Sequence, residues 1–385
     1  MSEATVTTSD VRPAAAPSGR ATIIDVRSFV FWVLAVAIGY SALHLYSQIS
    51  SDPHVQILPG VTWLALIQWT LYGAVLFFIV YTHQLYVRRS ATVTVAALLW
   101  GGFVATWFAA KANAALQDMF TLWFSGKFYD RWGLAISAAT NEELLKALGV
   151  VVLLLLPMAK VRSTLDGWYY GLMVGLGFQV VEDFLYTVQE SNNMGDAVQF
   201  LVHRGLFAGL WAHAVYSGLV GAGIAYFVTR KDKPMARRIV QMVGLFAVAW
   251  FFHFVWDSPA FNDFFGDGSG GFFLTILVKG APALATTLYV LRWGRRHERT
   301  QWLAFVNDHV DRSVVPEDAV AELTDKKSRK AAVDAARKDG GRAAGRRREQ
   351  LQDAQLYYIQ CVDEEGADSD AAVEAAIVVG ELRGD

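Results

Sequence analysis

The stretch LAISAATNEELLKALGVVVLLLLPM, residues 134–158, decides the fold, because it is long and apolar enough to cross a membrane and yet contains charges. A membrane-spanning helix needs about 20 mainly apolar residues. Glu142, Glu143 and Lys146 lie inside the stretch, and each charge costs at least about 2.5–3.5 kcal/mol near the centre of a membrane helix. The stretch therefore predicts a transmembrane helix whose charged residues have a functional role.

Further apolar stretches of similar length lie on both sides of this one. The chain of 385 residues is 54% apolar and only 18% charged, which is too apolar for one soluble domain. We therefore expect an all-α, polytopic membrane bundle of about eight transmembrane helices. The predicted spans are 29–48, 61–82, 91–110, 134–158, 168–189, 207–228, 239–256 and 272–291.

The basic residues between the spans predict how the chain crosses the membrane, because Lys and Arg concentrate in cytoplasmic segments. They gather before the first span, at Arg12 and Arg20 among others, and after the second, fourth, sixth and eighth spans, beginning with Arg88. This alternation predicts a multi-pass protein of the cell membrane with both termini in the cytoplasm. Residues 111–133 are an exception, because they should lie outside but include basic residues. Their aromatic character suits a helix in the membrane interface.

This pattern predicts three segments. They are a cytosolic N-terminal segment at 1–28, an eight-helix transmembrane domain at 29–292 and a charged, mostly helical cytosolic tail at 293–385. The first span should remain as an anchor, since its apolar run is longer than that of a signal peptide. The net charge of -2 gives no case for nucleic acid as a partner. Cys361 is the only cysteine, which excludes an intrachain disulfide and a cysteine-based zinc site.

Ionisable residues in four of the predicted spans lie at one depth. Counted at about 1.5 Å per residue from the predicted helix ends, all four fall roughly 5–12 Å from the outer edge of the membrane. They are Glu142, Glu182, His213 and His253. Because consecutive helices run in opposite directions, chance would scatter such residues across the membrane. We therefore expect them to meet in a wetted cavity that opens to the outer face.

Spacing along the first of these helices suggests different roles for its charges. Lys146 follows Glu142 by four positions, so the two side chains share a helix face and Lys146 can supply a countercharge. Glu143 points about 100° away from Glu142. One of the two carboxylates is therefore expected to serve chemistry and the other to serve structure.

The two histidines also have neighbours four positions later. Ser217 shares a face with His213, and Asp257 shares a face with His253. An Asp beside a His commonly fixes the tautomer of the imidazole. Ser217 and Asp257 are therefore expected to support the histidines.

Carboxylates and imidazoles in a wet intramembrane pocket predict hydrolysis by an activated water molecule. A Glu can act as general base on water, while His side chains supply protons and stabilise the oxyanion. The same side chains could instead hold a zinc ion whose bound water is the nucleophile. We expect no cofactor, with zinc as the alternative that the sequence leaves open. The zinc ligands would be Glu142, Glu182, His213 and His253.

Some of these charges have a structural alternative. Thr140 and Glu143 match a capping box, which would start a helix here and leave both glutamates outside the membrane. The remaining apolar stretch would then be about five residues too short to span. Lys279, in the last predicted span, is expected to be a partnered or snorkelling charge rather than a catalytic one.

These motifs resemble the PrsW branch of glutamic-type intramembrane proteases, which is related to the CPBP superfamily that includes the CaaX prenyl endopeptidases. The resemblance covers roughly residues 134–256. It rests on Glu-Glu-x-x-Lys ending at Lys146, on Phe178-x-x-x-Glu182, and on the later helices with His213 and His253.

The resemblance implies peptide-bond hydrolysis within or beside the membrane. It implies that Glu142 activates water with help from Glu143, and that Glu182 takes the place of a His in the CaaX branch. His213 and His253 would assist the oxyanion. Members of the family are linked to cleavage of membrane-anchored anti-sigma factors on their outer side.

The chain departs from the superfamily pattern at three positions. Ser217 and Asp257 stand where the superfamily often has Asn four residues after a late His, and Asp183 stands where related sequences often have Asn. An ionised Asp cannot donate a hydrogen bond to an oxyanion, which argues against that role for Asp257.

We therefore expect an intramembrane endopeptidase that cuts a membrane-anchored protein, such as an anti-sigma factor, near the outer face of the bilayer. Two other function classes stay open. A proton-coupled membrane transporter would need polar residues that continue into the inner half of the membrane. A non-catalytic membrane scaffold would act through the cytosolic tail.

Overall fold

A computed structural model of the chain describes residues 26–82, 89–156, 159–261, 264–265 and 269–384, and within these ranges the regular structure is helical. The basic residues Arg12, Arg20 and Arg88 lie outside the described ranges. The helices are α1 (Phe29–Ser50), α2 (Pro53–Ile57), α3 (Pro59–Thr82), α4 (Ala91–Leu99), η1 (Trp100–Ala105), α5 (Thr106–Trp123), α6 (Gly126–Phe128), η2 (Tyr129–Gly133), α7 (Leu134–Leu154), α8 (Thr164–Glu190), α9 (Met194–Phe200), η4 (Leu201–Ala208), η5 (Gly209–Trp211), α10 (His213–Thr229), α11 (Met235–Asp257), α12 (Ser269–His309), α13 (Glu317–Leu323), α14 (Lys326–Glu365) and α15 (Asp370–Arg383).

The chain is a multi-pass membrane protein. Seven helical segments of the described chain are long and apolar enough to cross a membrane. They are Phe29–Ser50, Pro59–Thr82, Ala91–Trp123, Thr164–Glu190, Met194–Thr229, Met235–Asp257 and Gly270–His309. The eighth expected span is α7, whose 21 residues are about 30 Å long and contain the charges of the Glu-Glu-x-x-Lys motif. The prediction of an all-α, polytopic membrane bundle is therefore confirmed, with seven candidate spans in the described chain and α7 as the helix that would bring the number to the predicted eight.

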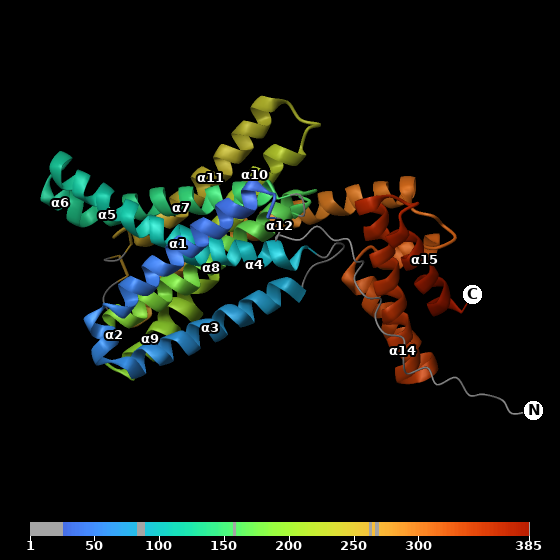
Figure 1. Cartoon of the computed structure of the whole chain (residues 1–385), viewed down its shortest axis with the longest axis horizontal. Coiled ribbons are helices and arrows are strands. Elements are labelled where there is room, and N and C mark those ends of the chain that lie inside the picture. The colour runs from blue at the N-terminus through green and yellow to red at the C-terminus, as the bar shows by residue number, and fades with distance from the viewer. Residues whose placement is uncertain (1–25, 83–88, 157–158, 262–263, 266–268, 385) are drawn as a thin grey trace, which may run out of the picture. The chain divides into compact units, whose positions relative to one another are not determined.

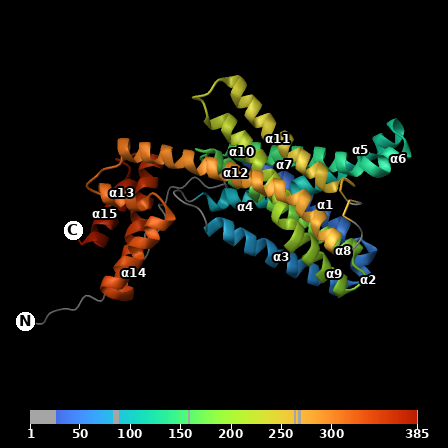
Figure 2. The same cartoon turned by 180° about the vertical axis from the view of Figure 1, so that it is seen from behind.

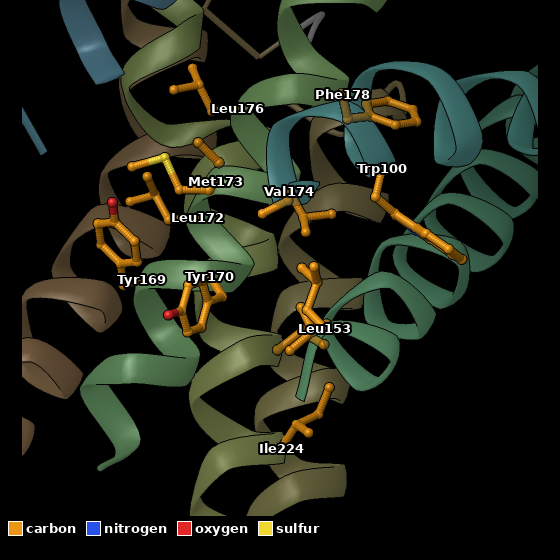
Figure 3. Close-up of a cluster of buried hydrophobic side chains, with 14 of the residues drawn as sticks. Trp100, Leu153, Tyr169, Tyr170, Leu172, Met173, Val174, Leu176, Phe178 and Ile224 are labelled. Carbon is orange, nitrogen blue, oxygen red and sulfur yellow. The ribbon is translucent and has the colours of Figure 1, made fainter. Parts of the chain in front are cut away.

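Helix α8 runs through the middle of the bundle, with α3, α4 and α10 beside it (Figures 1 and 2). Its side chains are buried along most of its length, and it starts at a capping box between Ser163 and Asp166. Trp100, Leu153 and Phe178 belong to the largest cluster of buried apolar side chains (Figure 3). This packing holds the helices that carry the ionisable residues in fixed positions, because protein interiors are close-packed.

Gly175 allows α8 and α10 to approach closely. A Cβ atom at Gly175 would collide with the backbone carbonyl of His213. Small residues at such crossings let the backbones of membrane helices pack directly against one another. Gly175 therefore sets the position of His213 relative to α8.

The first part of the segment expected to lie in the membrane interface, residues 111–123, belongs to the helix that continues the third span. Helix α5 extends to Trp123 without a break, and only the short helices α6 and η2 separate it from α7. Residues 109–119 are rich in Ala and other good helix formers, which accounts for the longer helix. Lys111 lies over the Trp107 ring at 4.3 Å, so its charge has a local partner within α5.

The residues from Arg299 onward form a second compact unit with its own apolar core. The core includes Val306, Leu323 and Ile359, all 3% exposed or less. Helix α14 is bent into a hairpin at Gly340 and Gly341, and the positive φ of 75° at Gly341 is accessible mainly to glycine. The tail is therefore a folded helical unit rather than a set of isolated charged helices.

Candidate active site

Four helices bring the predicted site residues together. Glu142, Glu143 and Lys146 lie on α7. Glu182 lies on α8, His213 is the first residue of α10, and His253 and Asp257 lie in the last turns of α11. The side chains of all but Glu182 and Asp257 are at most 8% exposed. The convergence that the common depth predicted is thus present in the structure.

His253 is held by the carboxylate of Glu143. The distance between His253 Nδ1 and Glu143 Oε1 is 2.9 Å. A carboxylate accepts hydrogen bonds, so this contact places a proton on Nδ1. The other ring nitrogen, Nε2, lies 3.2 Å from Asp257 Oδ2 and 3.6 Å from Glu142 Oε2. Asp257 therefore contacts His253, as the spacing predicted, but Glu143 also orients this imidazole.

His213 has the opposite tautomer from His253, with its proton on Nε2. Its Nδ1 lies 3.0 Å from Lys146 Nζ, and an ammonium group can only donate, so Nδ1 accepts this hydrogen bond. The proton of the ring is then on Nε2, which lies 2.9 Å from Glu182 Oε2. His213 Nδ1 is also 3.7 Å from Glu142 Oε2. Each histidine thus has one nitrogen bound by Glu143 or Glu182 and the other within 3.7 Å of Glu142 Oε2.

Glu142 is the central carboxylate of this arrangement. Its Oε1 accepts a hydrogen bond from the Asn113 side chain at 3.2 Å, which orients the carboxylate. Its Oε2 is buried and has no hydrogen-bond partner within the described residues. Lys146 Nζ lies 3.6 Å from this oxygen and 2.8 Å from Glu143 Oε1. Lys146 therefore supplies the expected countercharge, but it pairs more closely with Glu143 than with Glu142.

Glu142, His213 and His253 could hold a metal ion. They each offer one ligand atom, and these atoms lie within 4.8 Å of one another. One carboxylate and two imidazoles are a known ligand set of catalytic zinc. The carboxylates on the far ring nitrogens match the outer partners that usually orient metal-binding histidines. Glu142 Oε2 has no hydrogen-bond partner within the described residues, so it is available to coordinate a metal ion. We call Glu142, His213 and His253 the trio.

Glu182, which the sequence predicts as a fourth zinc ligand, does not lie with the other three. It lies outside the trio, against the far nitrogen of His213. It also accepts a hydrogen bond from Arg204 Nη2 at 3.1 Å. Arg204 Nε lies 2.5 Å from Asp183 Oδ1, and its guanidinium lies 4.5 Å above the Tyr186 ring. Asp183 therefore helps to anchor Arg204, which in turn contacts Glu182.

Sequence reasoning missed Arg204 and Asn113 as parts of the site. Arg204 lies between the predicted spans 168–189 and 207–228, and Asn113 lies in the segment expected at the interface. Arg204 is one residue of the π-helical turn η4, so its side-chain direction does not follow the spacing of an α-helix. A signal was nevertheless present, because Arg204 is the only Lys or Arg in the segment 190–206.

The helix that carries His213 starts later than predicted. The span was expected to begin at residue 207, but α10 begins at His213 after the turns η4 and η5 and a break at Ala212, where ψ is -140°. Interrupted helices at membrane depth occur where the backbone lines a cavity or is buried in protein. His213 is therefore placed at a helix start. Ser217 is buried one turn later, and its hydroxyl has no hydrogen-bond partner within the described residues.

The capping-box alternative for Thr140 is wrong. Helix α7 starts at Leu134, so Thr140 lies within the helix, and its hydroxyl oxygen accepts a hydrogen bond from Trp250 Nε1 at 3.1 Å. Lys279 donates to the carbonyls of Trp256 and Ser258 at 3.2 and 2.7 Å. It is thus a partnered charge, as expected, and it binds the end of α11 just beyond His253.

Comparisons with known proteins identify the family. The family model described as PrsW family intramembrane metalloprotease matches residues 89–282, half of the chain, and includes every residue of the site described above. Searches of curated proteins and of solved structures found no match. The description as a metalloprotease, together with the trio, favours zinc over the expectation of no cofactor. The chain belongs to the PrsW family of intramembrane metalloproteases.

Proposed function

We propose that this protein is an endopeptidase that uses zinc held by Glu142, His213 and His253 to cut a membrane-anchored protein close to the outer face of the bilayer. The observation that carries this proposal is the orientation of both histidines. His213 Nδ1 and His253 Nε2 lie 3.7 and 3.6 Å from the same oxygen of Glu142, and that oxygen has no hydrogen-bond partner within the described chain.

A zinc ion bound by the trio would lower the pKa of a water molecule and polarise the carbonyl of the scissile bond. Glu143 holds the proton on His253 Nδ1, and Glu182 holds the proton on His213 Nε2. These two carboxylates fix the tautomers in which His213 Nδ1 and His253 Nε2 carry lone pairs. A zinc ion would take these lone pairs in place of the present contacts to Lys146 and Asp257. Lys146 offsets the negative charge of Glu143 in the buried interior.

Asp257 is the carboxylate best placed to accept the proton of the attacking water. Its side chain is 25% exposed, compared with 5% for Glu142 and 14% for Glu182. Its Oδ2 lies next to His253 Nε2, and thus beside the trio. An ionised carboxylate is a proton acceptor, so this role agrees with the chemistry that argues against Asp257 as an oxyanion donor.

The substrate in this proposal is a single-span protein, such as a membrane-anchored anti-sigma factor, in the cell membrane. The alternation of basic residues supports a topology with both termini of the enzyme in the cytoplasm and the site near the outer face. A glutamic-type mechanism, in which Glu142 itself removes the proton from water, is the metal-free version of the same proposal. Removal of the metal distinguishes the two versions.

The experiment uses the full chain reconstituted in lipid vesicles with a single-span test substrate. Glu142→Gln should abolish cleavage, while Glu190→Gln, an exposed glutamate at the end of α8, should leave it unchanged. The purified protein should contain one zinc ion, and His213→Ala and His253→Ala should each lose it. A chelator should stop cleavage, and added zinc should restore it. Cleavage by Glu142→Gln would refute the assignment of the site, and cleavage by metal-free protein would refute the zinc version.

A proton-coupled transporter has less support. It would need a relay of polar residues that continues beyond the site into the inner half of the membrane, where the sequence offers mainly Lys146 and Lys279. Lys146 instead contacts Glu143, and Lys279 contacts the end of α11 beside Asp257. Both charges therefore belong to the surroundings of the site rather than to a path across the membrane.

A further inference from the structure

A second cavity lies between the start of α8, the end of α10, the start of α11 and the middle of α12. Its volume is about 220 Å³. Along α8, its residue Thr164 is about 27 Å from Glu182 at 1.5 Å per residue. The cavity therefore lies at the opposite end of the bundle from the trio. Its lining includes Thr164, Tyr226, Arg237, Gln241, Tyr289 and Trp293.

Thr164 gives this cavity an unsatisfied donor. The residue is 3% exposed, and its hydroxyl has no hydrogen-bond partner within the described residues. A buried hydroxyl without a partner costs about 1–3 kcal/mol, so a ligand that accepts its hydrogen bond would be favoured. Because Thr164 lines the cavity, such a ligand would be bound there.

The same residue is the first of the 27-residue helix α8. The first amides of a helix lack partners within the helix, and the helix dipole makes this end favourable for an anion. Asp166 also lies here, but Arg89 Nη2 pairs with its Oδ1 at 2.7 Å, and the amides of Arg162 and Ser163 donate to its Oδ2. Asp166 is therefore paired with Arg89, which also lies 3.6 Å from Glu298 Oε1, so the positive charge for an anion has to come from another residue.

Arg237 supplies the positive charge at the rim. Its neighbours are already bound, since Arg238 donates to the Phe227 carbonyl and Arg230 pairs with Asp232. Arg237 is exposed, and no acidic side chain of the described chain pairs with it. It is thus available to a ligand, and a guanidinium binds phosphate oxygens well.

The edge of the cavity suits a lipid. Tyr289 and Trp293 are 70% and 38% exposed on α12, which is one of the membrane-crossing helices. Tyr and Trp are common at the level of lipid headgroups. Val240, next to Gln241 on α11, is 69% exposed and offers an apolar surface for an acyl chain. A free phosphate ion would make no use of these apolar and aromatic groups.

We propose that this cavity binds the phosphate headgroup of an anionic lipid from the leaflet opposite the active site. The Thr164 hydroxyl at the start of α8 hydrogen-bonds the phosphate, Arg237 pairs with its charge, and Tyr289 and Trp293 flank the glycerol and the upper acyl chains. The site joins α8, α10 and α11, the helices that carry Glu182, His213 and His253.

The test is native mass spectrometry of the full chain in a neutral detergent, with dioctanoyl phosphatidylglycerol as the probe and dioctanoyl phosphatidylcholine as the neutral comparison. The wild-type protein should retain the anionic lipid. Arg237→Gln should weaken retention roughly tenfold, since it removes a charge-assisted hydrogen bond. Thr164→Val, which keeps the shape of the side chain, should weaken it several-fold. Lys231→Gln removes the same charge outside the cavity and should have no effect.

The outcomes distinguish a lipid phosphate from a free phosphate ion as the ligand of the cavity. Retention of the anionic lipid that survives an equal concentration of inorganic phosphate supports the lipid site. Displacement by inorganic phosphate would overturn it in favour of a free anion. Equal retention of phosphatidylcholine, or equal losses in Arg237→Gln and Lys231→Gln, would also overturn it. Thermal unfolding of each variant shows that a loss of lipid does not come from a loss of fold.

Discussion

Arg204 and Glu182 form an ion pair at the edge of the site, with 3.1 Å between Nη2 and Oε2. The same carboxylate oxygen lies 2.9 Å from His213 Nε2. Arg204 comes from the segment that precedes α10, so this pair connects the irregular turns before His213 to the helix beside it. The contact makes Arg204 a positioning residue, because it acts on His213 through Glu182.

Arg204→Met should therefore lower kcat by about 10- to 100-fold, the range typical of outer partners of a metal site. Its effect on KM should be small, because Arg204 does not touch the trio. Arg204→Lys should recover part of the activity, since it keeps the charge but not the two separate contacts to Glu182 and Asp183. Lys127→Met, an exposed change in α6, is the matched control. An equal loss in the Lys and Met variants would argue against the role of the charge.

Glu143→Gln should reduce the affinity for zinc by about 10- to 100-fold. Glutamine keeps the size of the side chain, but it cannot hold the His253 Nδ1 proton with a charge or pair with Lys146. The measurement is competition for zinc against a chromophoric chelator. Glu190→Gln serves as the control for one lost carboxylate. An unchanged zinc affinity in Glu143→Gln would show that this carboxylate does not support the metal.

Gly175→Ala should destabilise the protein by about 1–3 kcal/mol, because the added methyl group collides with the His213 carbonyl and overpacking has costs of this size. Thermal unfolding in detergent would show the loss as a lower midpoint. Gly244→Ala on α11 is the matched control, since nothing lies within 4 Å of its added Cβ. The control should be neutral or slightly stabilising, as expected for Ala in place of Gly in a helix. Similar midpoints for the two variants would disprove the close approach.

The stability of the first turn of α14, in the tail, should depend on pH through Asp325. Its side chain caps α14 and accepts hydrogen bonds from the amides of Ser328 and Lys327, at 2.9 and 2.8 Å. The bond from the Ser328 amide lowers the pKa of Asp325 below its ordinary value of 3.8. Because the pKa is lower in the folded state, the ionised cap contributes its full stabilisation of α14 at pH values above 3.8, the pKa of the unfolded state. This stabilisation is lost as the pH falls through the pKa of the folded state.

Amide hydrogen exchange of the full chain should therefore show weaker protection at the start of α14 in acid, relative to the rest of that helix. Asp325→Asn can still cap the helix but does not titrate in this range, so this variant should lose the extra acid sensitivity. The same acid sensitivity in Asp325→Asn would show that other groups cause it.

The sequence by itself determined the membrane helices and the residue types of the site. Span lengths and hydropathy are local properties of the sequence, because a helix in lipid must form all its backbone hydrogen bonds within its own segment. The shared face of Glu142 and Lys146, and that of His253 and Asp257, follow from helix geometry alone. The common depth of four ionisable residues also required only helix ends and a rise per residue.

Only the tertiary structure decided which atoms meet. The nitrogen of each histidine that faces Glu142 depends on Glu143 and Glu182, which come from other helices. The start of α10 at His213 depends on how the turns before it pack, which local spacing does not report. Long-range packing selects these contacts among many that the same helices could make, and for that reason helix periodicity located the site but left its ligand geometry open.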